Sequence, residues 1–346
     1  MLFNNTYYRA VWMEADNVFM IDQNVLPFRF SVICCKKYTD TCNAIVNMTT
    51  RGAGSIGAAA GFAMAQACLQ AKYENTADFL LKSRQQIEST RPTARNLFYA
   101  TEKVFNAALI SVEQALVMAQ KVADECADQG RRIGVNGNAL LAAGIRVLTH
   151  CNAGWLALVD YGSALAPIYE AHSCLKKPFV YVDETRPRGQ GARLTAWELF
   201  HQGIDHKIIP DNAAAHFMSQ GAIDICIVGA DRIAHNGDTA NKIGTLEKAL
   251  AAKYYNIPFY VAAPSSTYDK DCSNGSEIVI EYRTMDEVLF LNGYDAEGYA
   301  RRVVVANPGS EALNPAFDVT PAGLITGFIT EDGIFTPQEL ETKYAR

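Results

Sequence analysis

The chain has 346 residues, of which 49% are hydrophobic, and a formal net charge of −6. A chain of this length and composition can bury a sizeable core and is expected to form two domains. The acidic balance, without a dense run of lysine and arginine, argues against nucleic acid or an anionic membrane as the main partner. No stretch approaches the roughly 20 apolar residues that a membrane-spanning helix needs, so we expect a cytoplasmic protein.

The nine cysteines show no repeated spacing, and Cys34 and Cys35 are adjacent. An odd count in this arrangement argues against a disulfide framework and indicates a reducing compartment. No CxxC pair occurs and the six histidines are scattered, so no metal site is expected.

The first part of the chain predicts a small, mostly helical lobe that begins with a β-hairpin. Two apolar, aromatic-rich runs, 7–13 and 18–23, flank a short polar turn, as in a hairpin. Helical patterns follow over 39–48, 51–71, 76–89 and 112–128. The polar, glycine-rich segment 129–138 is the expected domain boundary, which divides the chain into 1–130 and 131–346.

Beyond this boundary, apolar runs of strand length alternate with helical patterns. The runs lie at 145–148, 179–182, 207–209, 223–228 and 259–262. Strands separated by helices predict a parallel sheet with right-handed βαβ crossovers. The expected fold class is therefore α/β, with a small, mostly helical amino-terminal lobe that carries a β-hairpin, followed by a Rossmann-like carboxyl-terminal domain.

The sequence RGAGSIG, from Arg51 to Gly57, has the GxGxxG spacing of a dinucleotide-binding loop. The residues before it look helical and lie outside the alternating region, so the fingerprint lacks its βαβ context and a nicotinamide-dependent oxidoreductase is disfavoured. The glycines instead allow backbone N–H groups to approach an anion at a helix start, with Arg51 beside them. A glycine turn that serves packing alone is the alternative.

In the run from Ile145 to Gly154 (IRVLTHCNAG), Cys151 directly follows a predicted strand and precedes a predicted helix. A thiolate at a helix amino terminus is stabilised by the helix dipole and free N–H groups, which suits a base or a nucleophile. A small buried side chain is the alternative, as for most cysteines. His150 is not an expected partner, because neighbouring strand residues face opposite ways.

The strand at 223–228 is followed by Asp231 and, after a polar loop, by Asn241, Lys242 and a helical pattern from near Thr245. Parallel sheets bind ligands at the carboxyl ends of their strands, so this stretch predicts a site for an anionic small molecule. The alternative for Asp231 is a structural carboxylate that caps the next helix. In a dry site its pKa would rise, and it could then act as an acid.

Further polar candidates lie in two loops. Arg186, Gln190 and Arg193 follow the strand at 179–182, and Arg91 lies in STRPTARNL. Each could bind a ligand, although surface pairing with a carboxylate is the alternative for each arginine.

Seven sequence motifs, in the same order and across almost the whole chain, resemble those of the methylthioribose-1-phosphate isomerases. They read RGAGSIG, STRPTARNL, THCNAG, ETRPRGQGARLTAWEL, GADRIAHNGDTANKIGT, PFYVAAPSSTYD and NPAFDVTP. The resemblance implies an aldose–ketose isomerase that converts 5-methylthioribose 1-phosphate to 5-methylthioribulose 1-phosphate in methionine salvage. A cytoplasmic homodimer that needs no cofactor is expected.

Matched by motif, Cys151 and Asp231 correspond to the family's two catalytic residues. The resemblance implies substrate contacts from Arg51, Gly52, Ala53, Arg91, Gln190, Asn241 and Lys242. In the favoured hypothesis a protonated Asp231 donates to the ring oxygen, while the Cys151 thiolate moves a proton from C2 to C1. A hydride shift from C2 to C1 is the alternative.

The chain departs from the family at Gly54 and Ser55, where the isomerases usually carry Pro-Ala and the related ribose 1,5-bisphosphate isomerases carry glycine. Ribose 1,5-bisphosphate and 5-deoxyribose 1-phosphate are therefore alternative substrates, and Arg95 is a candidate contact for a second phosphate. The same fold serves the regulatory subunits of translation initiation factor 2B, which bind partners and as a rule lack the Cys/Asp pair. Its presence here favours an enzyme.

Overall fold

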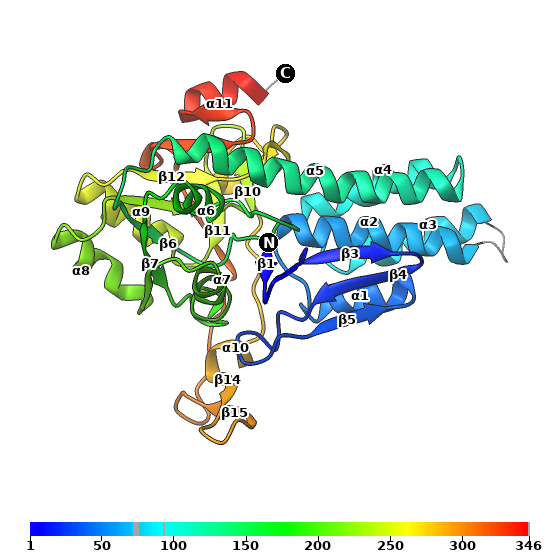
Figure 1. Cartoon of the computed structure of the whole chain (residues 1–346), viewed down its shortest axis with the longest axis horizontal. Helices are drawn as coiled ribbons and strands as arrows, with labels where there is room; N and C mark the ends of the chain where they lie inside the picture. Colours follow the sequence, from blue (N-terminus) through cyan, green and yellow to red (C-terminus); the bar gives the residue numbers. More distant parts are fainter. Residues whose placement is uncertain (72–75, 93, 345–346) are drawn as a thin grey trace.

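The structure consists of two lobes and a projecting arm. This computed structural model describes residues 1–71, 76–92 and 94–344. One lobe is mostly helical, the other is built on a sheet with helices around it, and the arm extends away from both (Figure 1). The predicted α/β class, with a helical amino-terminal lobe and a Rossmann-like parallel sheet after it, is confirmed.

The amino-terminal lobe combines a small antiparallel sheet with helices. The predicted hairpin is confirmed as β3 (Val11–Glu14) and β4 (Asn17–Ile21), and β5 (Val32–Cys35) adds a third strand that the sequence did not predict. A separate pair, β1 (Leu2–Phe3) and β2 (Thr6–Tyr7), precedes it. The helices of this lobe are α1 (Tyr38–Val46), α2 (Ala53–Gln70), α3 (Thr76–Ser89), α4 (Arg95–Ala108) and α5 (Val112–Asn138).

Helix α2 is the core of this lobe. Its sequence, AGSIGAAAGFAMAQACLQ, places small residues on every face, and residues 54–68 are all buried. Small side chains allow neighbouring helices to approach closely, so α2 packs against α1, α3, α4 and α5 at once. The helix is therefore fixed, and its amino terminus at Gly52 is held in one place.

The prediction that a helix ends at residue 128 is wrong, because α5 continues through the expected boundary to Asn138. The glycines of that segment are packing positions. A Cβ atom at Gly130 would lie 2.7 Å from the carbonyl oxygen of Gly162, and one at Gly137 would lie 2.4 Å from Pro167 Cγ. Because neither glycine has a Cβ atom, the segment that leads into α6 (Ala166–Ser173) can lie directly on α5. A division of the chain near residue 130 stays a prediction, and it would fall inside a helix.

The second lobe contains a seven-stranded sheet in the order β18-β17-β12-β9-β6-β7-β8, in which only β18 runs antiparallel. The five predicted strands are confirmed. The strands are β6 (Arg146–Thr149), β7 (Phe179–Asp183), β8 (His206–Ile209), β9 (Ile225–Val228), β12 (Phe259–Ala262), β17 (Gly327–Thr330) and β18 (Gly333–Phe335).

Both faces of this sheet are buried. Along β6, Val147 packs into one apolar cluster and Leu148 into another, and Ile227 and Val228 divide in the same way along β9. Because successive side chains of a strand point to opposite faces, a strand covered on both sides is apolar throughout. The unbroken apolar runs in the sequence therefore identify this sheet.

Short helices surround the sheet, and the helix expected near Thr245 is confirmed as α9. The α-helices of this lobe are α6, α7 (Ala196–His201), α8 (Ala214–Ser219), α9 (Thr245–Tyr254) and α11 (Pro337–Tyr344). Single turns occur at Gly191–Thr195 (η2), Asp211–Ala213 (η3), Ser265–Thr267 (η4), Gly275–Glu277 (η5) and Ala322–Leu324 (η6).

A second sheet of four short strands lies against the carboxyl edge of β9, in the order β13-β10-β11-β16. Its strands are β10 (Arg232–Ala234), β11 (Thr239–Lys242), β13 (Tyr268–Asp269) and β16 (Phe317–Thr320). The expected polar loop between Asp231 and Asn241 is instead a β-hairpin made by β10 and β11. Asn241 and Lys242 consequently lie on a strand.

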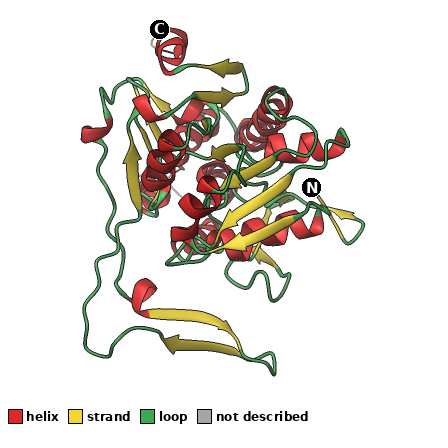
Figure 2. Ribbon diagram, turned by 90° about the vertical axis from the view of Figure 1, so that its left-hand side faces the viewer, coloured by secondary structure: helices red, strands yellow, loops and turns green. Residues whose placement is uncertain are grey.

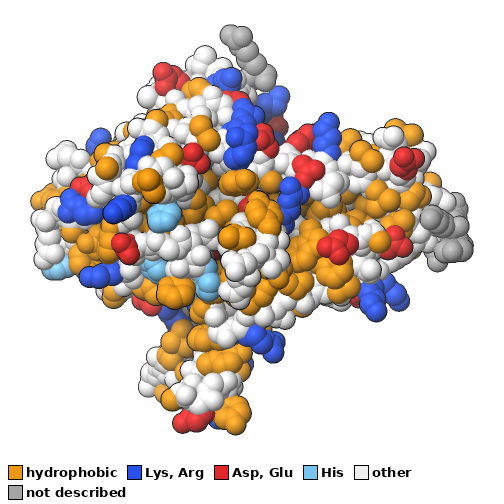
Figure 3. Space-filling model, in the orientation of Figure 1, with side chains coloured by type: hydrophobic (Ala, Val, Ile, Leu, Met, Phe, Trp, Pro, Cys, Tyr) orange, Lys and Arg blue, Asp and Glu red, His pale blue; other side chains and the backbone are white. Residues whose placement is uncertain are grey.

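The arm is a β-hairpin of β14 (Phe290–Tyr294) and β15 (Ala300–Val304), preceded by α10 (Asp286–Leu289). Figure 2 shows its two strands standing apart from the other sheets, joined by long connections. No sequence pattern predicted it. No helix in the described ranges is long and apolar enough to cross a membrane, and on the face shown in Figure 3 basic side chains are scattered among acidic and apolar ones.

Candidate active site

The candidate site lies where the strand order of the large sheet reverses. From β6 the chain runs outward to β7 and β8, and it then returns to place β9 on the other side of β6. Such a reversal separates the loops that leave two neighbouring strands and opens a crevice at their carboxyl ends. Cys151 follows β6 and Asp231 follows β9, so both reach this crevice.

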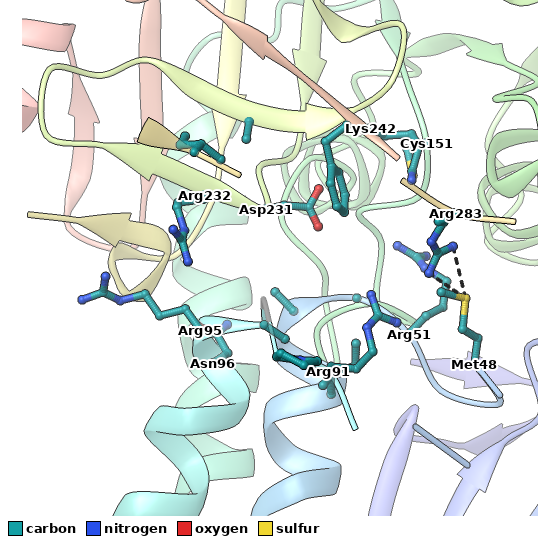
Figure 4. A pocket seen from close by; sticks show the side chains of 18 of the residues that line it. Met48, Arg51, Arg91, Arg95, Asn96, Cys151, Asp231, Arg232, Lys242 and Arg283 are labelled. Atoms are coloured by element: carbon teal, nitrogen blue, oxygen red, sulfur yellow. Dashed lines mark hydrogen bonds between the residues drawn. The ribbon is translucent and has the colours of Figure 1, made fainter. Parts of the chain in front are cut away.

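A cavity of about 270 Å³ opens at this point. Eight of the nine predicted site residues line it: Arg51, Gly52, Ala53, Arg91, Cys151, Gln190, Asp231 and Lys242. The ninth, Asn241, lines a smaller adjoining pocket, and its side chain donates to Thr245 Oγ1 at 3.0 Å. In Figure 4, Asp231, Lys242 and Cys151 lie on one side of the cavity, and Arg51 and Arg91 face them from the amino-terminal lobe.

The amino terminus of α2 lies so close to the Cys151 loop that there is no room for a Cβ atom at Gly52. Gly52 has φ +90°, and a Cβ atom there would lie 2.4 Å from Ala157 Cβ. Arg51 donates to Asn152 Oδ1 at 2.7 Å and to the Asn152 carbonyl at 2.9 Å. The amino terminus of an 18-residue helix, with its positive dipole end, therefore lies beside the thiol-bearing loop.

Cys151 does not lie at a helix amino terminus, so that expectation is wrong; the next helix begins only at Ala166. Cys151 and Thr185 instead both adopt left-handed backbone conformations, with φ +65° and +64°. The Cys151 N–H donates to Thr185 Oγ1 at 2.9 Å, and Thr195 Oγ1 donates to the Cys151 carbonyl at 2.7 Å. Two threonine hydroxyls thus hold a conformation that costs a residue other than glycine about 1 kcal/mol or more.

The loop after Cys151 is organised around the buried carboxylate of Glu198. That carboxylate accepts hydrogen bonds from Asn152 Nδ2 at 2.8 Å, the Trp155 N–H at 2.9 Å and the Tyr169 hydroxyl. A Cβ atom at Gly154 would lie 1.8 Å from Glu198 Oε2. Glu198 therefore serves as a local anchor, which satisfies backbone donors in a segment without regular structure.

His150 does not line the main cavity, although it lines the smaller adjoining pocket. Its ring lies 2.9 Å from Asp183 Oδ2 through Nδ1 and 2.8 Å from the Ile243 carbonyl through Nε2. Burial raises the pKa of Asp183, and the buried Lys248 lies 3.6 Å from the same carboxylate. His150, Asp183 and Asp211 bring three potential metal ligands within 4.8 Å of one another, but each already takes part in hydrogen bonds within the protein.

Three charged side chains line the cavity on the sheet side, Asp231, Arg232 and Lys242, of which Arg232 is ion-paired with Asp269. The Asp231 side chain is exposed to the cavity. The protein that surrounds it nevertheless raises its pKa by desolvation, although the positive charges of Lys242 and Arg51 act to lower that pKa. Lys242 donates to the Ala316 carbonyl at 2.7 Å and lies 4.6 Å from the centre of the Phe317 ring. Burial lowers the Lys242 pKa, so both groups shift toward their neutral forms.

Two of the lining residues have buried polar atoms without hydrogen-bond partners in the described part of the chain. These atoms are Arg91 Nη1 and Gln190 Oε1. Burial lowers the Arg91 pKa, and the neighbouring charge of Arg283 adds to this effect. Buried polar groups are nearly always paired, so the cavity is built to receive a ligand with both an acceptor and a donor.

Other candidates lie elsewhere or are already paired. Arg186 donates to the Val288 carbonyl at 2.9 Å and Arg193 to the Leu26 carbonyl at 2.9 Å, and neither lines the cavity. Arg95 lines it but is ion-paired with Asp269. Thr93 of STRPTARNL lies outside the described residues.

Gly54 and Ser55, which depart from the family pattern, do not line the cavity. A Cβ atom at Gly54 would lie 2.5 Å from Cys126 Sγ. Ser55 Oγ donates to the Leu156 carbonyl and accepts from the Val159 N–H, both at 2.9 Å. This departure therefore concerns the packing of α2 against the neighbouring loop and helix.

Several lining residues were missed at the level of sequence. They include the apolar side chains of Met48, Ile56, Ile278, Val279 and Phe317, and two further cations, Arg232 and Arg283. Phe317 lies in the NPAFDVTP motif, which could have indicated it. Arg283 lies in a stretch, EYRTMDE, that carries no recognisable signal.

Comparison with known proteins gives the chain a family. A model of the initiation factor 2 subunit family matches residues 49–337. A methylthioribose-1-phosphate isomerase of Brucella anthropi is 45% identical, over 96% of this chain and 95% of its own. The solved 5-methylthioribose 1-phosphate isomerase of Pyrococcus horikoshii OT3 is 39% identical with a TM-score of 0.86, covering 98% of this chain and 96% of that one. Subunit delta of translation initiation factor eIF-2B from A. fulgidus is 38% identical with a TM-score of 0.83, over 97% and 100%.

The chain therefore belongs to the initiation factor 2 subunit family. Within that family, the relationship to the methylthioribose-1-phosphate isomerases that the seven motifs predicted is confirmed. The similarity to the solved isomerase covers 98% of this chain and therefore extends over both lobes.

Proposed function

We propose that this chain is an aldose–ketose isomerase that converts 5-methylthioribose 1-phosphate to 5-methylthioribulose 1-phosphate in methionine salvage. The observation that carries the proposal is one cavity that brings together a thiol, a carboxyl group with a raised pKa and a set of cations. The similarity to proteins named for this activity over 96% of the chain supports it.

The substrate explains why these groups are needed. Its anomeric oxygen carries the phosphate, so the sugar cannot open to a free aldehyde by the route that ordinary aldoses take. The enzyme has to open a ring that is phosphorylated at C1 and then move a hydrogen between C2 and C1. An acid near the ring oxygen and a base near C2 would accomplish this, while the phosphate is held by cations.

Asp231 is the proposed acid. Its raised pKa keeps the carboxyl group protonated to higher pH than that of an exposed aspartate, so that it can donate to the ring oxygen. Cys151 is the proposed base, which takes the C2 proton as a thiolate and returns it at C1. Its 7% exposure limits competition from water at the reacting carbon.

The proposed phosphate and sugar contacts are Arg51, Gly52, Ala53, Arg91, Gln190, Asn241 and Lys242. Arg91 and Gln190 support this role because each has a buried polar atom without a partner among the described residues. Arg51 supports it differently: its bonds to Asn152 fix the guanidinium, so a ligand that it binds is positioned relative to the Cys151 loop.

The methylthio compound is the favoured substrate because of the lining that remains after these polar groups are placed. Ile56, Ile278, Val279 and Phe317 provide apolar surface suited to a methylthio group. The candidate for a second phosphate contact, Arg95, is ion-paired with Asp269, and the same carboxylate also pairs with Arg232. Ribose 1,5-bisphosphate would bring two more negative charges, which these two arginines, sharing one carboxylate, would offset only in part.

A hydride shift from C2 to C1 is the mechanistic alternative, in which Cys151 would only position or polarise the substrate. Turnover in deuterated water separates the two routes. Deuterium at C1 of the product is expected for the proton route, and its complete absence would favour the hydride shift.

The substrate test supplies 5-methylthioribose 1-phosphate, ribose 1,5-bisphosphate and 5-deoxyribose 1-phosphate separately and follows ketose formation by NMR. Conversion of the methylthio compound with the highest kcat/KM is expected. A higher value for the bisphosphate would contradict the substrate assignment, and conversion of none would contradict the enzyme assignment.

A binding role without catalysis is the second candidate, because the A. fulgidus protein named as an eIF-2B subunit is 38% identical. The thiol and carboxyl group at one cavity favour the enzyme. We further propose a cytoplasmic homodimer, as the family resemblance implies. Sedimentation of the purified chain at about twice its 37.9 kDa mass would support the dimer, and sedimentation as a monomer would contradict it.

A further inference from the structure

Arg283 brings a guanidinium group to the cavity that no motif assigned. It lies between η5 and α10, at the base of the arm, and lines the cavity with Asp231 and Lys242. Its side chain is only 12% exposed. A cation so far removed from water needs acceptors within the protein or on a ligand.

Two carboxylates hold Arg283 in place. Its Nε lies 3.2 Å from Glu281 Oε1, and its Nη1 lies 3.6 Å from Glu287 Oε1. Both terminal nitrogens also lie 3.6 Å from Met48 Sδ (Figure 4). A thioether sulfur is a weak acceptor, so the donors that face Met48 lack a strong partner on that side in the described structure.

Arg91 is in a similar condition. Its Nη1 is buried and has no hydrogen-bond partner among the described residues. The charge of Arg283 acts on Arg91 and lowers its pKa beyond the effect of burial. Two guanidinium groups that repel each other and have unused N–H donors are stabilised by an anion that binds both. The anion offsets the repulsion and accepts charge-assisted hydrogen bonds from both groups.

We propose that Arg283 binds the phosphate group of the substrate together with Arg91, in addition to the residues that the motifs assign to that group. The identity of the sugar phosphate rests on the proposed function, but the contact itself requires only a phosphate dianion. Its oxygens replace Met48 Sδ as the acceptor for the Arg283 donors. Glu281 and Glu287 position the guanidinium for this contact.

The first experiment measures steady-state kinetics of Arg283→Met with 5-methylthioribose 1-phosphate. The change removes the charge and keeps an unbranched apolar side chain. We expect KM to rise by about 10- to 100-fold, the range for loss of a charge-assisted hydrogen bond. The change in kcat should be smaller, because a phosphate contact is made in the ground and transition states alike.

Arg188→Met is the matched control. Arg188 Nη1 pairs with the same Glu287 oxygen, at 2.9 Å, but does not line the cavity. Its KM should stay within about twofold of wild type, as for surface changes. An unchanged KM in Arg283→Met would overturn the proposal. The same rise in KM in both variants would also overturn it, because the rise would then come from a change in the arm and not from a lost phosphate contact.

Inorganic phosphate separates this inference from the proposed function. Phosphate should raise the unfolding temperature of wild type and Arg188→Met, and the rise should be lost in Arg283→Met. The proposal would be overturned if phosphate stabilised Arg283→Met as much as wild type, or if it did not stabilise wild type at all. Either result would hold whether or not the chain isomerises any sugar phosphate. If Arg283→Met does not fold, Arg283→Gln, which can still donate to Glu281, takes its place under the same criteria.

Discussion

The two threonine hydroxyls that hold Cys151 allow a direct test of how the site is built. In Thr185→Val the side chain keeps its branched shape at a residue with φ +64°, so the backbone preference changes little. What is lost is the hydroxyl, which accepts from the Cys151 N–H at 2.9 Å and donates to the Asp183 carbonyl at 3.0 Å.

The expected cost follows from these two bonds. Thr185 is fully buried, so the Cys151 N–H loses its acceptor without access to bulk water. A buried donor left unsatisfied costs about 1–3 kcal/mol, and the second bond contributes about 1 kcal/mol, which gives about 2–4 kcal/mol in all. Folded chains are stable by about 5–15 kcal/mol, so the variant should remain folded. Cys151, free to leave its left-handed conformation, should be misplaced, and kcat should fall by about 100-fold.

Urea unfolding and steady-state kinetics measure the two effects, with Thr185→Ser as the control that keeps the hydroxyl. Thr185→Ser should retain most of the stability and activity. A Thr185→Val variant within about 0.5 kcal/mol of wild type, or a Thr185→Ser variant equally impaired, would refute the role of the hydroxyl.

Two further predictions concern charged groups of the cavity. Because burial raises the Asp231 pKa, the stability that the protonated group provides is present at low pH and lost as the pH rises through its folded-state pKa. Asp231→Asn should therefore unfold at a higher temperature than wild type at neutral pH, and the difference should vanish in acid; a lower unfolding temperature at neutral pH would contradict the sign. Arg51→Ala should raise KM by about 10-fold or more, because it removes a charged contact to the phosphate. It should also lower the unfolding temperature, because the hydrogen bonds to Asn152 are lost. An unchanged KM would argue against the phosphate contact of Arg51.

The parallel sheet was predictable because its strands are buried on both faces. Unbroken apolar runs such as 223–228 have no other simple explanation at that length, and the alternation with helices gives the topology. The end of α5 was not predictable from local pattern. Its glycines resemble a linker, and only the close approach of Gly162 and Pro167 shows that they are needed inside a helix.

The candidate site was predictable where strand ends coincide with motifs, as at Cys151 and Asp231. The hydrogen bonds that hold Cys151 were not predictable, because they come from Thr185 and Thr195, which belong to other parts of the chain. Arg283 lay beyond reach for a similar reason: its place at the cavity depends on the long connection between the second sheet and the arm, and no local pattern fixes where such a segment returns.

The most direct test of the central claim follows 5-methylthioribose 1-phosphate by NMR in the presence of wild type, Cys151→Ser and Asp231→Asn. Wild type should convert it to the corresponding ketose 1-phosphate. Each variant should remain folded and lose at least about 100-fold in kcat, as expected for the loss of a general acid or base. No conversion by wild type, or near-wild-type turnover by either variant, would contradict the account.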